Sequence, residues 1–307
     1  MAINKVMRAA LKAITALEPD AKKSYKVERQ LEVLTARLRG KPSDYHMWDR
    51  VIRFDDHAIP VRLFAPSGRG FSPLLIYFHG GGWVTGGIEN YTGVCADLAT
   101  ATGCAVALVD YRLAPEHRFP AAPEDCYAVT REFFLGRVPS LFPDDITLIG
   151  DSAGGNLAAA VSLMARDRGE FLPKRQILIY PSTYNDHTEA SPFASIRDNG
   201  ADYLLTSKRI EEFIELYRSS DEDLQNPYFA PLLARDFSRQ PRTLLLTAEF
   251  CPLRDEGEAY GEKLREAGND VETARLSDAL HSFIMLPPSF EHVQEAFRII
   301  NDFLAKG

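Results

Sequence analysis

Six compact apolar runs recur along the chain and alternate with segments of helix length. The runs are LLIYFH from 74, CAVALVDY from 104, ITLIG from 146, QILIYP from 176, TLLLTA from 243 and VETARL from 271. Helix-length segments lie at 120–135, 153–168, 255–267 and 291–304. Continuous apolar strands that alternate with helices are typical of a mostly parallel sheet covered on both faces. The alternation therefore predicts an α/β fold.

Two regions depart from this alternation. The stretches RVIRFDD (50–56) and PVRLFAP (60–66) precede the first run and predict a strand pair joined by a short turn. With this pair the predicted sheet has eight strands. Residues 183–220 bring a polar loop and the helical pattern SKRIEEFIELYR. We interpret 183–220 as an insertion over the sheet rather than a separate domain.

The first forty residues contain two helical patterns with an apolar stripe each. The first stripe consists of Ile3, Val6, Met7, Ala10, Leu11, Ile14 and Leu17. The second consists of Val27, Leu31, Leu34 and Leu38 and ends before Gly40, a residue that commonly terminates helices. Packing onto the body of the protein is the favoured interpretation of both stripes, and a membrane-surface role is the alternative.

Charge and cysteine usage narrow the class of protein. The formal net charge of -8 argues against a nucleic-acid partner, which requires a basic face. We see neither a signal-peptide pattern nor an apolar segment long enough to span a membrane, and we therefore expect a cytoplasmic protein without membrane insertion. The four cysteines have no metal-ligand spacing and predict reduced, buried thiols: Cys95, Cys104, Cys126 and Cys251. We expect no metal and no cofactor.

Two glycine-containing stretches follow apolar runs, where parallel sheets place their ligand sites. In FHGGGW, the glycines 80–82 allow backbone N–H groups to point into a cavity. This loop also fits a plain turn or a phosphate cradle, but the GK[ST] ending of a phosphate loop is absent. In IGDSAGGNLAAA, the segment 150–154 has the pattern G-x-S-x-G between a strand and an Ala-rich helix. That context predicts a nucleophile elbow that exposes the hydroxyl of Ser152.

A serine hydroxyl needs a base to accept its proton before it becomes a good nucleophile. Seven histidines are candidates. Four of them lie in polar stretches and are predicted to be surface residues: His46, His57, His187 and His292. His79 belongs to the glycine loop. His117 lies in a turn-rich stretch, and we predict a structural role for it. His281 lies between the last strand and the last helix and is the best-placed candidate base.

Six motifs taken together resemble one known group of enzymes. HGGGW, DYRLAPEHRFPAA, GDSAGGNLAAA, NPYFAPLLA, TAEFCPLRDEG and ALHSF occur in this order within residues 50–307. The combination resembles the hormone-sensitive-lipase group of α/β-hydrolase carboxylesterases. This resemblance implies an α/β-hydrolase fold with a core of 46–182 and 221–307, and a helical cap made of 1–45 and the insertion 183–220. It also implies a serine carboxylesterase that acts on small, short-acyl esters.

The same resemblance assigns roles to individual residues. Ser152 corresponds to the nucleophile and His281 to the general base. The backbone N–H groups of three residues correspond to the oxyanion hole: Gly81, Gly82 and Ala153. Asp151 and Asn156 correspond to residues that support the elbow rather than take part in the chemistry.

Position 251 departs from the group's pattern. The group has Asp-Pro-Leu-x-Asp, and its first aspartate is the acid that orients the histidine, whereas this chain has CPLRD from Cys251. A neutral thiol is a weak hydrogen-bond acceptor and cannot offset the charge of an imidazolium. If nothing replaces the carboxylate, a loss of turnover on the order of 10⁴ is expected, with residual activity remaining.

Three replacements for the missing acid can be considered. Asp255 lies four residues further on, although a role as the N-cap of the next helix is favoured. Glu249 shares a strand face with position 251 but lies about 6–7 Å back along the strand. A thiolate at Cys251 would require a strongly lowered pKa. Two other functions remain open beside the esterase: a ligand-binding protein on a hydrolase scaffold, and an amidase or peptidase. The sequence also leaves a homodimer open.

Overall fold

The computed structural model describes residues 8, 11–13, 15, 19–38, 45–66, 73–138 and 145–306. Within these residues an eight-stranded sheet has the order β1-β2-β4-β3-β5-β6-β7-β8. Its strands are β1 (Tyr45–Phe54), β2 (His57–Pro66), β3 (Leu74–Phe78), β4 (Ala105–Val109), β5 (Ile146–Asp151), β6 (Arg175–Ile179), β7 (Arg242–Phe250) and β8 (Val271–Leu280). Strands β3 to β8 are parallel, whereas β2 pairs antiparallel with β1 and β4. The predicted mostly parallel sheet is confirmed.

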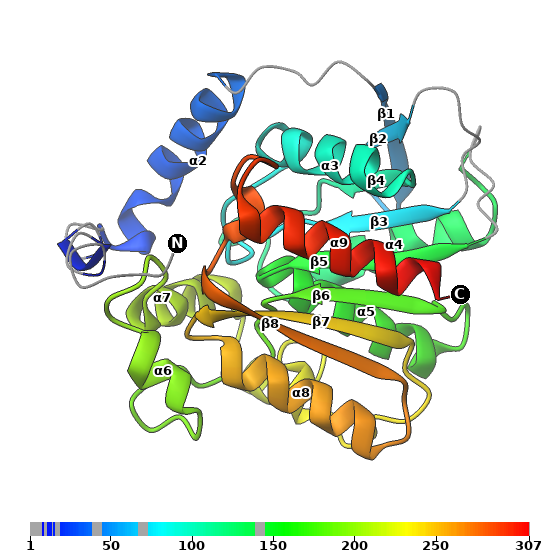
Figure 1. Cartoon of the computed structure of the whole chain (residues 1–307). Helices are drawn as coiled ribbons and strands as arrows, with labels where there is room; N and C mark the ends of the chain where they lie inside the picture. Colours follow the sequence, from blue (N-terminus) through cyan, green and yellow to red (C-terminus); the bar gives the residue numbers. More distant parts are fainter. Residues whose placement is uncertain are drawn as a thin grey trace.

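Helices lie on both faces of this sheet (Figure 1). The described helices are α2 (Ala21–Leu38), α3 (Ile88–Thr102), α4 (Ala121–Phe134), α5 (Ala153–Arg168), α6 (Ala194–Asn199), α7 (Ser207–Tyr217), α8 (Arg254–Glu266) and α9 (Glu291–Ala305). Short 3-10 helices are η1 (Glu222–Gln225), η2 (Pro231–Leu233) and η3 (Phe283–Met285). Helix α3 packs against α9, and α4 packs against α5. Because both faces are covered, every residue of β3, β4, β5 and β6 is buried.

The helix α3 was not anticipated from the sequence, unlike the four helix-length segments, which are confirmed as α4, α5, α8 and α9. Its buried side contains small and mixed residues rather than a leucine stripe, among them Cys95, Ala96 and Ala99. Several threonines in IENYTGVCADLATAT further weaken the helical signal, because threonine has a low helix propensity.

The connections at the carboxyl ends of the strands carry the motifs singled out in the sequence. Strand β3 leads into the glycine loop, β5 into Ser152, β7 into Cys251 and β8 into His281. Because these strands are parallel, all four connections leave the sheet on the same side. Helices α6 and α7 of the insertion lie at the left of Figure 1, on the side of the molecule where α2 is also found. Helix α2 packs against α7 and α3.

The apolar stripe on α2 does not pack onto the protein. Val27, Leu31 and Leu34 are 57%, 54% and 56% exposed, so the packing prediction is wrong for these three residues. The opposite side of the helix faces the protein and is held by polar contacts. Arg29 Nε, for example, donates a 2.7 Å hydrogen bond to the carbonyl oxygen of Val84. Hydrogen bonds to backbone groups, together with the burial of Ala21, therefore fix the orientation of α2.

Three further predictions concern the first apolar stripe, the cysteines and membrane-spanning helices. The first predicted stripe (3–17) lies outside the described residues except for Leu11. All four cysteines are free and buried, as predicted. Within the described ranges, no helix has the length and hydropathy needed to cross a membrane.

Candidate active site

Ser152 occupies a sharp turn between β5 and α5. Its backbone angles are φ 56° and ψ -120°, a conformation that is strained for a residue with a side chain. The flanking glycines are required by close backbone approach: a Cβ on Gly150 would collide with the carbonyl of Gly154, and one on Gly154 with the carbonyl oxygen of Phe78. The backbone N–H of Ser152 donates to Ile179 at 2.9 Å. The predicted strand-turn-helix context of the serine is therefore present.

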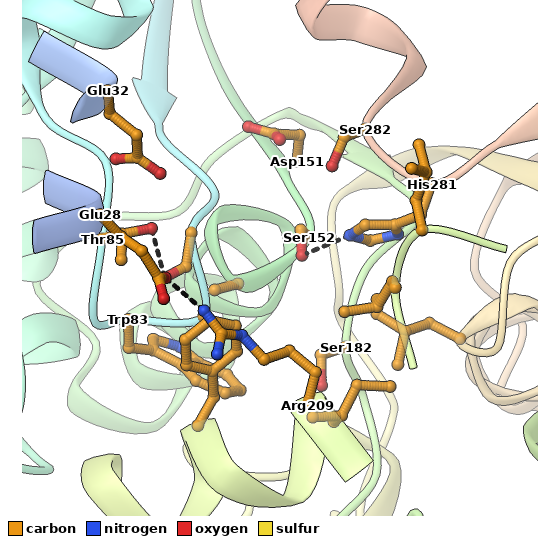
Figure 2. Close-up of a pocket in the computed structure, with 18 of the residues that line it drawn as sticks. Glu28, Glu32, Trp83, Thr85, Asp151, Ser152, Ser182, Arg209, His281 and Ser282 are labelled. Carbon is orange, nitrogen blue, oxygen red and sulfur yellow. Dashed lines mark hydrogen bonds and ion pairs between the residues drawn. The ribbon is translucent and has the colours of Figure 1, made fainter. Parts of the chain in front are cut away.

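The structure brings Ser152 and His281 together from positions 129 residues apart. The Nε2 atom of His281 lies 3.0 Å from the Oγ of Ser152. Figure 2 shows the serine side chain pointing toward the imidazole ring. A serine hydroxyl in hydrogen-bond contact with an imidazole nitrogen is the arrangement that nucleophilic catalysis requires.

Cys251 contacts the other nitrogen of the same ring. Its Sγ atom lies 3.1 Å from Nδ1 of His281, and the cysteine is completely buried. Burial raises the pKa of the Cys251 thiol far above its usual value, so the sulfur remains protonated. The thiolate alternative is therefore not supported by the surroundings of this residue. A neutral thiol thus stands where the resemblance led us to expect a carboxylate.

The thiol also leaves the tautomer of His281 undetermined. To accept the serine proton, Nε2 must carry a lone pair, so the ring hydrogen must be on Nδ1 and point at the sulfur. Sulfur is a weak acceptor of that hydrogen. The S–H group can instead donate to Nδ1, which would place the ring hydrogen on Nε2 and leave no base for Ser152. A carboxylate can only accept and would remove this second arrangement.

The pKa of His281 shows the effect of having a neutral thiol, rather than a carboxylate, beside its ring. Burial lowers the pKa of His281 to about 3. No carboxylate in the described part of the chain forms a hydrogen bond or an ion pair with this ring. The imidazole is therefore neutral at physiological pH, and its cationic form is costly because nothing compensates the charge.

The two acids considered as replacements are used elsewhere. Asp255 accepts a 2.7 Å hydrogen bond from the backbone N–H of Ser195 and pairs with Arg254. Glu249 accepts from the backbone N–H of Asp278 at 2.7 Å. The predicted N-cap role of Asp255 is also wrong, because it lies inside the first turn of α8. Its carboxylate joins α8 to α6 across the fold, a contact that local sequence could not indicate.

The glycine loop approaches the serine from β3. Gly81 and Gly82 have φ values of 113° and 60°, which favour glycine. A Cβ on Gly82 would collide with the ring of Phe213, which lies against the loop. Gly81, Gly82 and Ala153 line the same cavity as Ser152. Within the described residues, no acceptor pairs with their three backbone N–H groups.

Asp151 joins this loop to the elbow. Its buried carboxylate accepts hydrogen bonds from Tyr77 Oη at 3.0 Å, Tyr91 Oη at 3.0 Å and the backbone N–H of Gly80 at 2.9 Å. Burial raises the pKa of Asp151 to about 6, although these hydrogen bonds favour the charged form. The carboxylate thus has several donors but does not contact the reacting pair.

Two further polar side chains hold the backbone around the elbow. Asn156 Nδ2 donates to the carbonyl oxygens of Ser182 at 2.9 Å and Phe229 at 2.8 Å. His79 is buried, and its Nδ1 lies 2.8 Å from the carbonyl oxygen of Gly80. Burial lowers the pKa of His79 to about 4. Both side chains contact backbone groups of the site rather than Ser152.

A cavity of about 290 Å³ opens in front of Ser152 and His281. Apolar residues of the insertion line one part of it, including Leu205, Ile210 and Phe213. Charged residues line another part: Glu28, Glu32 and Arg209. Figure 2 shows the ion pair between Glu28 and Arg209, which joins α2 to α7. Sequence reasoning missed these charged residues, because nothing in their local pattern distinguishes them from exposed helix residues.

His187 contradicts its predicted surface location. It is completely buried, and its Nε2 lies 2.7 Å from a carboxylate oxygen of Glu256, which is also buried. The same Glu256 accepts a hydrogen bond from the backbone N–H of Thr183. The polar stretch around 187 therefore folds back over the start of α8, an arrangement invisible in the local sequence.

Comparison with known proteins identifies relatives over most of the chain. Residues 75–285 match the family described as the alpha/beta hydrolase fold. The chain is 34% identical over 269 residues to an arylesterase of Saccharolobus solfataricus, covering 87% of this chain and 86% of that protein. It is 33% identical over 301 residues to an ethyl acetate hydrolase of Pseudomonas putida, covering 94% and 90%. A solved structure, the hyperthermophilic esterase from the archaeon Pyrobaculum calidifontis, has a TM-score of 0.88 and 35% identity, with 98% and 97% covered.

Proposed function

Because the chain belongs to the alpha/beta hydrolase fold family, in the group of carboxylesterases related to hormone-sensitive lipase, we propose that it hydrolyses small short-acyl esters through Ser152 and His281. The family and the named relatives make the chain a carboxylic ester hydrolase. One observation carries the assignment of residues: the 3.0 Å contact between Ser152 Oγ and His281 Nε2 at a strained turn in the cavity.

In the proposed reaction, Ser152 Oγ attacks the ester carbonyl while its proton moves to Nε2 of His281. The resulting tetrahedral intermediate collapses, the C–O bond to the alcohol breaks, and His281 returns the proton to the leaving oxygen. Water then attacks the acyl-serine with the same base, which releases the carboxylic acid and restores the serine. The neutral state of His281 supports its role as the base.

The oxyanion would be held by the backbone N–H groups of Gly81, Gly82 and Ala153. Their lack of other acceptors within the described chain and their position on the cavity wall support this role. Preorganised donors of this kind are worth about 10²–10³ in turnover each. Asp151 and Asn156 would support the geometry by fixing the glycine loop and the turn.

We infer that Cys251 fills the acid position without performing the work of the acid. The thiol contacts Nδ1 of His281 but is neutral and can donate as well as accept. The enzyme is therefore slow as it stands, and the oxyanion hole supplies much of the remaining rate acceleration. The cavity of about 290 Å³ lies at the lower end of the range of roughly 300–1,000 Å³ that is typical of small-molecule pockets, which supports small substrates.

Two measurements test the proposal. Hydrolysis of p-nitrophenyl acetate and its longer homologues should decline with acyl length, and the Ser152→Ala variant should retain no turnover above background. A fluorophosphonate should label Ser152 in the parent, as read by mass spectrometry of the modified peptide. Ser162→Ala, on helix α5 after this turn but away from the cavity, is the matched control. Turnover in Ser152→Ala equal to that of the parent would overturn the catalytic assignment. Binding without turnover in the parent would favour the ligand-binding alternative.

A further inference from the structure

Helix α2 presents its charged side to the protein and its apolar side to solvent. On the inner side, Arg29 donates to the carbonyl oxygens of Val84 and Ala114, both at 2.7 Å. Glu32 accepts from the backbone N–H of Gly86 at 3.1 Å. Ala21 and Tyr25 of this helix pack against the core, but these polar contacts leave the stripe of Val27, Leu31 and Leu34 without a contact that explains it in the described fold.

We define the outer face of α2 by the exposed residues that lie on one side of the helix: Lys23, Lys26, Val27, Gln30, Leu31 and Leu34. At 100° per residue, Val27, Leu31 and Leu34 fall within about 60° of one another, with Lys23 beside them. In the described chain, α2 is the one helix with three exposed large apolar side chains, since the others occur on separate elements or loops. Single exposed apolar residues are ordinary, but a contiguous stripe indicates an interaction surface.

The acidic residues of α2 are confined to its inner side. Its two acidic residues, Glu28 and Glu32, both line the cavity on the inner side. The exposed lysines Lys23 and Lys26 lie on the outer face and its flank. An apolar stripe bordered by lysines is the pattern of helices that lie in the interface of an anionic membrane. A second copy of this chain fits less well, because the outer face of α2 includes no acidic residue that could pair with these lysines across a symmetric contact.

We propose that the outer face of α2 binds peripherally to an anionic lipid surface. The apolar stripe enters the boundary between headgroups and acyl chains, and the lysines contact the lipid phosphates. The net charge of -8 repels the remainder of the protein from such a surface, so attachment depends on this face. Because the inner side of α2 lines the cavity that contains Ser152, attachment would hold the cavity next to the lipid. In Figure 1, α2 lies at the periphery of the molecule, beside α7.

The test is co-sedimentation with vesicles, which is independent of turnover. The parent should bind vesicles of phosphatidylcholine mixed with phosphatidylglycerol, bind pure phosphatidylcholine more weakly, and dissociate as salt is added. The combined variant Val27→Ser, Leu31→Ser and Leu34→Ser should bind ~10-fold or more weakly. Lys23→Gln and Lys26→Gln should each weaken binding about fivefold, and only on the anionic vesicles.

Two controls distinguish binding through the outer face of α2 from non-specific binding by any exposed apolar residue and from misfolding. Val51→Ser removes an equally exposed apolar residue on β1 (60% exposed) and should leave vesicle binding unchanged. Circular dichroism and the hydrolysis of p-nitrophenyl acetate in solution should match the parent for every α2 variant, because the altered side chains are exposed. A failed catalytic assignment would therefore leave the binding result interpretable.

Two outcomes overturn the proposal. One is a parent that does not bind anionic vesicles, or α2 variants that bind as the parent does. The other is a concentration-dependent dimer, seen by size-exclusion chromatography, that Leu31→Ser dissociates while vesicles remain unbound. The second outcome would make the outer face of α2 a contact between two copies of the chain.

Discussion

Two buried histidines on the carboxyl side of the sheet have opposite protonation behaviour. His281 faces the neutral thiol of Cys251, and burial lowers its pKa to about 3. His187 is equally buried, but Glu256 lies 2.7 Å away. Burial acts to lower the pKa of His187, but the negative charge of Glu256, together with the charges of Glu211 and Asp186, outweighs burial and raises this pKa above its usual value.

The comparison shows that this fold can pair a buried histidine with a carboxylate. Glu256 lies five residues after Cys251, in the first turn of α8. The pair of His187 and Glu256 is thus structural and joins the insertion to the core, whereas no carboxylate among the described residues pairs with the histidine beside Ser152. The partner, rather than burial, decides whether a histidine can become cationic here.

The largest expected effect on kcat comes from giving His281 a carboxylate partner, as His187 has in Glu256. Cys251→Asp places a carboxylate beside Nδ1 of His281, which fixes the tautomer and stabilises the imidazolium formed when Ser152 is deprotonated. We expect kcat to rise ~10²–10⁴-fold. Steady-state hydrolysis of p-nitrophenyl acetate measures this, with Cys251→Ser as the neutral control. An unchanged kcat in Cys251→Asp would contradict the idea that the acid is missing.

Exchanging each histidine for glutamine separates a base from a structural group. His281→Gln should reduce kcat about 10²-fold, less than in a complete triad, because triad residues act as a unit and the acid is already absent. His187→Gln should lower thermal stability and leave kcat within about threefold of the parent at a temperature where it is folded. Equal losses of kcat in the two variants would show that His281 is also only structural.

Removing the carboxylate from the pair of His187 and Glu256 should lower the free energy of unfolding. Glu256→Gln leaves His187 buried beside a neutral amide, and removal of one partner from a buried pair costs about 3 kcal/mol. Because the folded pKa of His187 is raised, the pair's contribution is fully present below pH 6.5 and is lost as pH rises through the folded pKa. Urea unfolding at several pH values should therefore show a larger loss in acid than in alkaline buffer. A loss independent of pH would assign the effect to packing alone.

The pH dependence of kcat/KM should differ between the parent and Cys251→Asp. With its pKa near 3, His281 of the parent remains in the base form throughout the neutral range, so it should set no acid limb there. In Cys251→Asp the new carboxylate raises the pKa of His281, and kcat/KM should fall as pH drops through that raised value. A limb present in both proteins belongs to another group, for which Asp151, with a pKa of about 6, is the candidate.

The smallest expected effect concerns Asp255. Its carboxylate is held by Ser195 and Arg254 rather than His281, so Asp255→Asn should change kcat by less than about threefold while slightly lowering stability. The same kinetic assay measures it, in the parent and in Cys251→Asp. A collapse of kcat in Asp255→Asn, together with a neutral Cys251→Asp, would make Asp255 the working acid through a rearranged loop.

Much of the fold was accessible from the sequence because the signals are local. The six apolar runs and the strand pair before them predicted all eight strands, and the helices α4, α5, α7, α8 and α9 were expected near their observed bounds. The segment 150–154 predicted a turn that only flanking glycines allow, as the collisions of a Cβ at Gly150 and Gly154 demonstrate. The order of Ser152, Cys251 and His281 along the chain led to a pairing that the parallel strands then bring within hydrogen-bond distance.

The sequence failed where long-range contacts override local character. The polar surroundings of His187 predicted exposure, but Glu256 and Thr183 enclose it. The stripe of Val27, Leu31 and Leu34 predicted burial, but polar anchors turn the other side of α2 inward.

The sequence by itself thus determined the order of the strands and of the helices other than α3, the glycine-flanked turn and the absence of a carboxylate at position 251. Only the tertiary structure decided which groups meet: the thiol of Cys251 with Nδ1 of His281, and the carboxylate of Glu256 with His187. Periodicity and turn chemistry act over a few residues, so a sequence records them directly. The partners of a buried side chain come from distant segments, and their charge sets its protonation, which no local pattern encodes.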